Sequence, residues 1–193
     1  HTYWKNPGDS GLPTELTWQL PAGLDAGDIA WPVPHKIAIG TLANYGYEGT
    51  VLLPVPVTVA QTFAPGPLAK DVTVQLKASW LVCRKECIPE EGNFTLQLPI
   101  RSTTALHGAA FDAAQKAQPQ PLAKPGAQQQ AQVDGDALQV RVAGLPAALR
   151  GKTLDLFPET PEVLHNAAEG TQRWEGDVWT ARIPLAEQRS NSP

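Results

Sequence analysis

The feature that most constrains this chain is a pair of cysteines, Cys83 and Cys87, the only two among 193 residues. A disulfide between them would close a loop of about five residues, and the loop-entropy estimate for so small a loop is roughly 2 kcal/mol. That value is at the low end of what disulfides contribute, and a stabilising disulfide would be expected to join distant segments. A close pair that gains little stability from being joined is better suited to opening and closing.

The spacing of the two cysteines predicts a turn between them. On a straight strand, residues four apart lie about 13 Å from each other at ~3.3 Å per residue, whereas a disulfide needs Cα atoms within about 7 Å. Residues 84–86 must therefore reverse the chain and leave both sulfurs beside a hairpin tip near the surface. Within this turn, Arg84 and Lys85 favour the thiolate form of a cysteine and Glu86 opposes it.

Four interpretations of the pair compete. A redox-active dithiol is favoured by the short loop, the charged turn and the absence of other cysteines. An inert local disulfide, a metal site and two buried free thiols are the alternatives. The metal site lacks a second close pair of ligands, and the nearest histidines, His35 and His107, are distant in sequence. We therefore expect a redox pair that uses neither a metal nor another cofactor.

Composition excludes several classes of function. The net charge is −4 and no basic cluster occurs, so a nucleic-acid partner is not expected. No run of eighteen apolar residues is present, so this segment is not expected to contact a membrane. The chain starts at His1 and contains no methionine, which we interpret as a processed or excised segment. Its 19 prolines and short apolar runs favour a secreted β-protein over a cytosolic α/β enzyme.

The first hundred residues have the pattern of short strands. Residues 71–83 are the clearest, because apolar side chains at even positions from Val72 to Trp80 alternate with polar ones. Pro54 and Pro56 remove two backbone donors from the apolar stretch 50–59, which indicates an edge strand or a bulge there. Further strands are expected at residues 16–20, 28–31 and 93–100. With Gly- and Pro-rich turns between them, these strands predict an all-β, antiparallel sandwich.

The pattern changes after residue 103. Residues 104–117 are alanine-rich and spaced for one helical face, and residues 118–132 are a Pro-, Gln- and Ala-rich stretch typical of a linker. Strand patterns return at 137–143, 153–157 and 178–183. We therefore predict a first domain over residues 1–103, a helix and linker over 104–132, and a second, smaller β domain over 133–193. With only about sixty residues, that second domain is expected either to be incomplete or to share a sheet with the first.

The motif around the cysteines resembles a known family. Residues 80–90 (WLVCRKECIPE), with VLLPV at 51–55 upstream, resemble the N-terminal periplasmic domain of DsbD-type protein-disulfide reductases. The resemblance covers most of the chain and is strongest over residues 1–100. The opening residues 1–13, the Trp31–Pro32 pair, and residues 44–49 and 156–160 are closer to the ScsB branch, which is linked by name to suppression of copper sensitivity.

This resemblance implies a fold, a reaction and partners. It implies an immunoglobulin-like β-sandwich in the periplasm that belongs to a larger inner-membrane protein. The electron donor would be the protein's own transmembrane domain, and the acceptors would be periplasmic proteins, often with a thioredoxin fold, whose disulfides are reduced. Cys87 would attack the partner's disulfide and Cys83 would resolve the mixed disulfide. The alternative is a copper-binding or partner-docking β-sandwich with an inert disulfide.

The family also shields its cysteines with a cap loop that bears an aromatic residue. The matching stretch here is residues 34–47, which contains no phenylalanine. By this resemblance Tyr45, Tyr47, Ile39 and Leu42 are the candidate cap residues, with Tyr45 the first choice.

Overall fold

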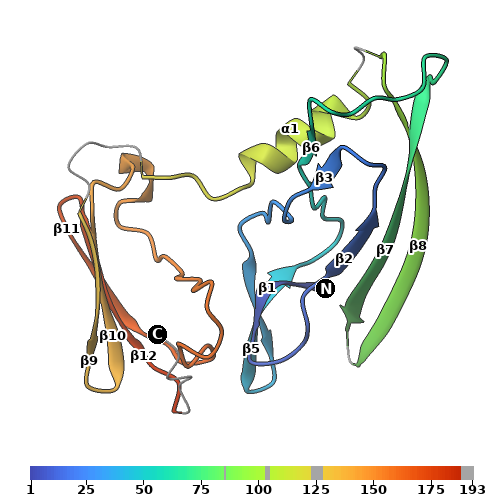
Figure 1. The fold of residues 1–193 in the computed structure, drawn as a ribbon. Coiled ribbons are helices and arrows are strands. Elements are labelled where there is room, and N and C mark those ends of the chain that lie inside the picture. Colours follow the sequence, from blue (N-terminus) through green and yellow to red (C-terminus); the bar gives the residue numbers. More distant parts are fainter. Residues whose placement is uncertain (85, 103–104, 123–127, 188–193) are drawn as a thin grey trace. The chain divides into compact units, whose positions relative to one another are not determined.

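The computed structural model describes residues 1–84, 86–102, 105–122 and 128–187 of the chain, and Figure 1 shows the path of its strands. One α-helix, α1 (Gly108–Lys116), and a 3₁₀ turn, η1 (Ala147–Leu149), accompany the strands. The strands are β1 (Thr2–Gly8), β2 (Glu15–Gln19), β3 (Leu24–Ala26), β4 (His35–Ile39), β5 (Leu42–Tyr47), β6 (Val57–Val59), β7 (Asp71–Cys83), β8 (Cys87–Pro99), β9 (Gln129–Asp134), β10 (Ala137–Ala143), β11 (Thr171–Glu175) and β12 (Val178–Pro184). The predicted fold class, an immunoglobulin-like all-β domain followed by a smaller β domain, is confirmed.

The described strands form four sheets. Their orders are β1-β5-β4, β2-β7-β8, β3-β6 and β11-β12-β10-β9. By contacts the chain divides into two compact units: the first comprises residues 1–5, 12–35 and 46–119, and the second comprises residues 6–11, 36–45 and 120–193. The domain boundaries expected from the sequence stay a prediction.

The long hairpin of β7 and β8 dominates the first unit. Its antiparallel register is unbroken from Asp71 opposite Pro99 to Cys83 opposite Cys87, and β2 pairs with the other edge of β7. β7 covers the residues that the alternating pattern predicted, and β8 begins before the predicted residue 93. Val74 is 2% exposed and lies on the face that the alternation assigned to the core. The hairpin therefore carries the cysteine pair to its tip.

One predicted strand in the first unit is wrong, and another is shorter than expected. Residues 28–31 form no strand, and residues 50–59 form one only at β6. Two isolated backbone hydrogen bonds join these segments in place of a regular β-ladder. Ala30 N donates to Pro54 O at 2.7 Å, and Gly27 N donates to Pro56 O at 2.9 Å. Because neither proline has an N–H to return, the ladder cannot continue through them.

The second unit is built on the sheet of β9–β12. Val140, Leu145, Trp179 and Ala181 form its buried core. Residues 153–157, predicted to be a strand, form none, because the side-chain amide of Gln172 satisfies the backbone N–H and C=O of Leu154 in place of a neighbouring strand. Residues 129–132, expected in the linker, belong to β9.

The linker prediction extended too far for a physical reason. The side chains of β9 are all exposed, and its backbone pairs with β10. An exposed edge strand needs no apolar side chains, so its composition resembles that of a linker. The helix expected over residues 104–117 is present as α1, nine residues long. Within the described part of the chain, no helix has the length and apolar character needed to cross a membrane.

A glycine allows β1 and β5 to approach closely in the first unit. A Cβ atom at Gly46 would collide with the backbone carbonyl of Thr2. Any other residue at position 46 would therefore push β1 away. This contact matters because β1 carries Tyr3, which lies 1% exposed in the core.

Candidate functional site

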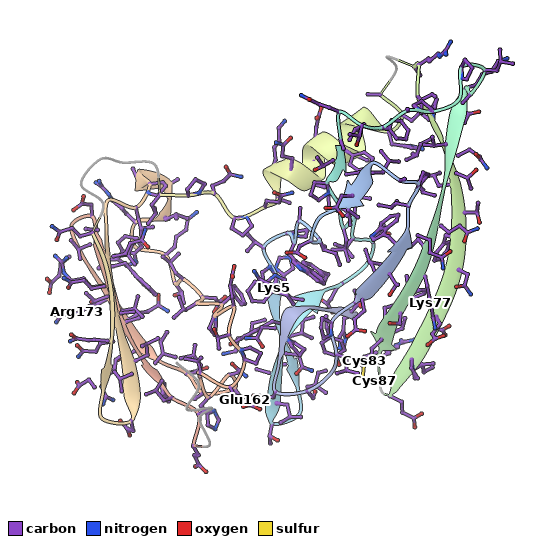
Figure 2. The ribbon with its side chains drawn as sticks, in the orientation of Figure 1. Lys5, Lys77, Cys83, Cys87, Glu162 and Arg173 are labelled. Carbon is purple, nitrogen blue, oxygen red and sulfur yellow. A yellow bond between two sulfur atoms is a disulfide. The ribbon has the colours of Figure 1, made fainter. Side chains whose placement is uncertain are left out.

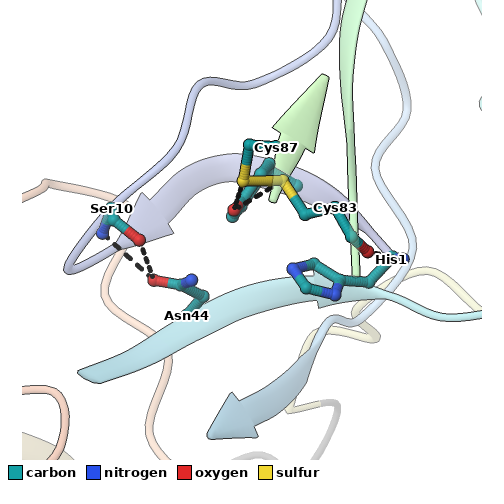
Figure 3. The surroundings of a disulfide bond; sticks show 6 residues. His1, Ser10, Asn44, Cys83 and Cys87 are labelled. Carbon is teal, nitrogen blue, oxygen red and sulfur yellow. Dashed lines mark hydrogen bonds between the residues drawn. A yellow bond between two sulfur atoms is a disulfide. The ribbon is translucent and has the colours of Figure 1, made fainter. Parts of the chain in front are cut away.

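The two cysteines form a disulfide at the tip of the β7–β8 hairpin, labelled in Figure 2. Cys83 is the last residue of β7 and Cys87 is the first residue of β8, and they stand opposite each other with their Cα atoms 4.1 Å apart. The turn that their spacing predicted is therefore present. The two sulfurs lie 2.07 Å apart, and Figure 3 shows the bond between them.

Backbone hydrogen bonds explain why these two side chains meet. Cys83 N donates to His1 O at 3.0 Å, and His1 N donates to Cys83 O at 2.8 Å. Both backbone groups of Cys83 therefore face away from β8, which makes Cys83 and Cys87 a non-hydrogen-bonded pair of the ladder. In such pairs the backbones lie closer and the side chains are nearest to each other.

The two cysteines differ in exposure. Cys83 is 3% exposed, whereas Cys87 is exposed. A thiolate from another molecule must reach a sulfur directly to exchange with it, so Cys87 is the accessible partner. Cys83 is buried, and its sulfur is bonded to that of Cys87 on the neighbouring strand.

A tyrosine hydroxyl contacts both sulfurs. Tyr3 Oη donates a hydrogen bond to Cys83 Sγ at 3.1 Å and lies 3.2 Å from Cys87 Sγ. The ring of His1 packs edge-on against the ring of Tyr3, with centroids 5.5 Å apart. Figure 3 shows His1 beside the disulfide. The arrangement places an O–H donor at the atoms where negative charge would develop if the disulfide were opened.

Tyr3 is not among the site residues predicted from the sequence. Tyr3 precedes Cys83 by 80 positions. No strand is predicted over residues 2–8, because the Asn6–Pro7–Gly8 run has turn composition. Only the resemblance of residues 1–13 to the ScsB branch drew attention to this segment.

The charged turn between the cysteines is partly described. Arg84 N donates to Glu86 O at 3.2 Å, and both residues are exposed. Lys85 lies outside the described residues, so the predicted effect of the turn on the thiolates stays a prediction. Among the residues that the structure describes, no three His, Cys, Asp or Glu side chains gather where they could hold a metal ion.

Tyr45, the first candidate for the cap, is buried in the second unit. Its hydroxyl donates to Asn166 Oδ1 at 2.7 Å, and its ring packs edge-on against Phe157 at a centroid distance of 5.1 Å. Burial, with smaller contributions from the charges of Asp9 and Asp155, raises the pKa of Tyr45 to about 12. The tyrosine is therefore held neutral and hydrogen-bonded.

The other cap candidates lie on β4 and β5. Tyr47 is buried, and its hydroxyl donates to Pro32 O at 2.7 Å; burial raises the pKa of this tyrosine. Ile39 ends β4 and is half-buried, and Leu42 begins β5 and is 42% exposed. The cap role of all four residues stays a prediction.

Comparisons with known proteins found a matching family and a solved structure of similar fold. The family described as "Thiol:disulfide interchange protein DsbD, N-terminal" matches residues 1–99, which include the disulfide and Tyr3. The crystal structure of the N-terminal periplasmic domain of ScsB from Proteus mirabilis has a similar fold. The TM-score is 0.60 at 15% sequence identity, over 96% of this chain and 68% of that chain. No curated protein matches the chain at a significant level. The chain belongs to the family of DsbD N-terminal domains.

Proposed function

We propose that this chain is a periplasmic thiol–disulfide exchange domain of a larger membrane protein. It takes electrons from the transmembrane domain of that protein and reduces disulfides of periplasmic partners, including proteins with a thioredoxin fold. Membership of the DsbD N-terminal family and the Cys83–Cys87 disulfide support this proposal. The exchange itself needs no cofactor, since thiolates and disulfides react directly.

The observation that most supports this proposal is the difference in solvent exposure between the two cysteines. Cys87 is exposed and Cys83 is 3% exposed. The donor's thiolate attacks Cys87 Sγ, the Cys83–Cys87 bond breaks, and its electron pair leaves on Cys83 Sγ. The Cys83 sulfur is then a thiolate that accepts the hydrogen bond from Tyr3. A second donor thiolate displaces Cys87, which leaves the domain reduced and the donor oxidised.

The same steps in reverse order pass the electrons to a periplasmic partner. The Cys87 thiolate attacks one sulfur of the partner's disulfide, and the partner's other sulfur leaves as a thiolate. Cys83 then attacks Cys87 Sγ, reforms the intramolecular disulfide and releases the partner with both sulfurs reduced. The proposed cap residues on β4 and β5 would limit reaction with stray oxidants until a partner docks.

Trapping of partners tests the assignment of roles. The Cys83→Ala variant cannot resolve a mixed disulfide, so it is expected to accumulate partners bound through Cys87. The Cys87→Ala variant lacks the exposed sulfur and is the matched control, expected to trap little. Trapping by Cys87→Ala alone would reverse the two roles. A pair of variants that both trap nothing would favour the inert disulfide.

A further inference from the structure

One edge of the redox hairpin is open. β8 is the outer strand in the order β2-β7-β8, and no described strand pairs with its other side. Because both backbone groups of Cys83 bond to His1, the Cys83–Cys87 pair is non-hydrogen-bonded, and the N–H and C=O of Cys87 point away from β7. The register is unbroken, so every second residue of β8 repeats this direction.

The residues of β8 whose backbone N–H and C=O point away from β7 form an outward row. They are Cys87, Pro89, Glu91, Asn93, Thr95, Gln97 and Pro99. All seven are exposed. The two prolines have no N–H to offer, and prolines at outward positions of an edge strand limit indiscriminate pairing. Between them, Glu91 to Gln97 present a full set of backbone donors and acceptors, which is what an added β-strand needs.

Apolar side chains flank the same edge. Ile88, Phe94 and Leu96 are 56%, 51% and 53% exposed and share one face of β8, because they lie an even number of residues apart. A strand added to the edge could place alternate side chains against them. The exposed Cys87 is the first residue of the row whose backbone groups point outward. It lies about 13 Å from Glu91 at ~3.3 Å per residue.

We propose that the free edge of β8 pairs with an extended segment of a disulfide-bearing partner and presents the partner's disulfide to Cys87. The inference rests on the proposed function and names the form in which a partner is recognised. Backbone hydrogen bonds along Glu91–Gln97 hold the segment, and Ile88, Phe94 and Leu96 select apolar side chains at alternate positions. Recognition through the backbone tolerates partners of different sequence.

The test uses the reduced full chain and a synthetic probe. The probe is an extended peptide of alternating Thr and Val, long enough to span residues 87–97, with a terminal cysteine joined as a mixed disulfide to thionitrobenzoate. Attack by Cys87 forms a bond to the peptide's sulfur and releases the coloured thionitrobenzoate thiolate. Peptides with cysteine at either end cover parallel and antiparallel pairing. Free cysteine carrying the same thionitrobenzoate group is the reference.

We expect the better peptide to react about tenfold faster than the reference, the gain that roughly 1.4 kcal/mol of additional binding gives. N-methylation of alternate backbone amides of the peptide should remove the gain. Thr95→Pro removes one outward N–H and should reduce the gain, whereas Thr95→Val keeps the N–H and should preserve it. Circular dichroism verifies that both variants fold. The N-methylated peptide tests the same bond in the unaltered protein.

The outcomes separate this inference from the proposed function. Equal rates for the peptides and for the free cysteine probe would overturn edge pairing while leaving exchange at Cys87 intact. If the protein self-associates and Thr95→Pro abolishes that self-association, edge pairing with a partner would also be overturned. A second copy of the chain would then occupy the edge of β8. A reduced protein that fails to react even with the free cysteine probe would overturn the proposed function.

Discussion

The hydroxyl of Tyr3 donates a hydrogen bond to the buried sulfur of Cys83 across 3.1 Å. The two residues are 1% and 3% exposed, so water does not compete strongly for this bond. In the proposed exchange, opening of the disulfide leaves Cys83 as an anion in a place where an unpaired charge would be costly. The tyrosine is positioned to stabilise that anion.

Tyr3→Phe should therefore slow reduction of the disulfide. Hydrogen bonds to charged groups contribute roughly 1.5–3 kcal/mol, so loss of the O–H donor should lower the rate of reduction by dithiothreitol about tenfold or more. The rate is measured by the appearance of free thiols at constant pH. In denaturant, where Tyr3 no longer contacts the sulfurs, the variant and the original chain should be reduced equally fast. Equal rates in the folded proteins would contradict the proposed role of the hydroxyl.

Gln172 should be a main determinant of stability in the second unit. Its side chain bonds the backbone N–H and C=O of Leu154 at 2.8 and 3.1 Å and accepts from Trp179 Nε1 at 2.9 Å. Gln172→Ala leaves these groups without their partner, which should cost about 2 kcal/mol or more in the free energy of unfolding. Gln132, whose amide bonds Gln139 on an exposed surface, is the control, and Gln132→Ala should change stability by less than about 0.5 kcal/mol. Urea unfolding of both variants measures the difference, and similar losses would refute the assignment.

Tyr45 should make the second unit sensitive to alkaline pH. Its pKa is raised from 10.0 to about 12 in the folded chain. Between these values the unfolded chain releases the proton and the folded chain keeps it, so stability is full below pH 10 and falls as pH rises toward 12. In Tyr45→Phe this fall in stability should become shallower. Unfolding curves across this pH range test the prediction, and an unchanged slope would contradict it.

The sequence was sufficient for the hairpin but not for its surroundings. The alternation over residues 71–83 predicted β7, and the four-residue separation of the cysteines predicted the turn, because both are local patterns. Tyr3 could not be found in this way, since a contact across 80 residues depends on how β1 joins its sheet. Composition also failed where backbone bonding replaced side-chain packing: β9 is exposed throughout, and Gln172 satisfies a segment that resembled a strand.

Proline and aromatic residues show a second limit on what can be predicted from the sequence. Pro54 and Pro56 were expected to disturb a strand, and in the structure they end the ladder. The resemblance alone makes Tyr45 a candidate cap residue, and the hydrogen bond of Tyr45 to Asn166 joins segments 121 residues apart. A side chain's partners across such separations are not encoded in local spacing.

The reduction potential of the Cys83–Cys87 pair tests the central claim most directly. Equilibration with glutathione or dithiothreitol buffers, followed by thiol alkylation, gives the fraction reduced at each potential. A pair that relays electrons should be reducible well above about −300 mV, within the range of exchange proteins. A potential below about −300 mV is that of a structural disulfide, and that result would contradict an electron-relay function.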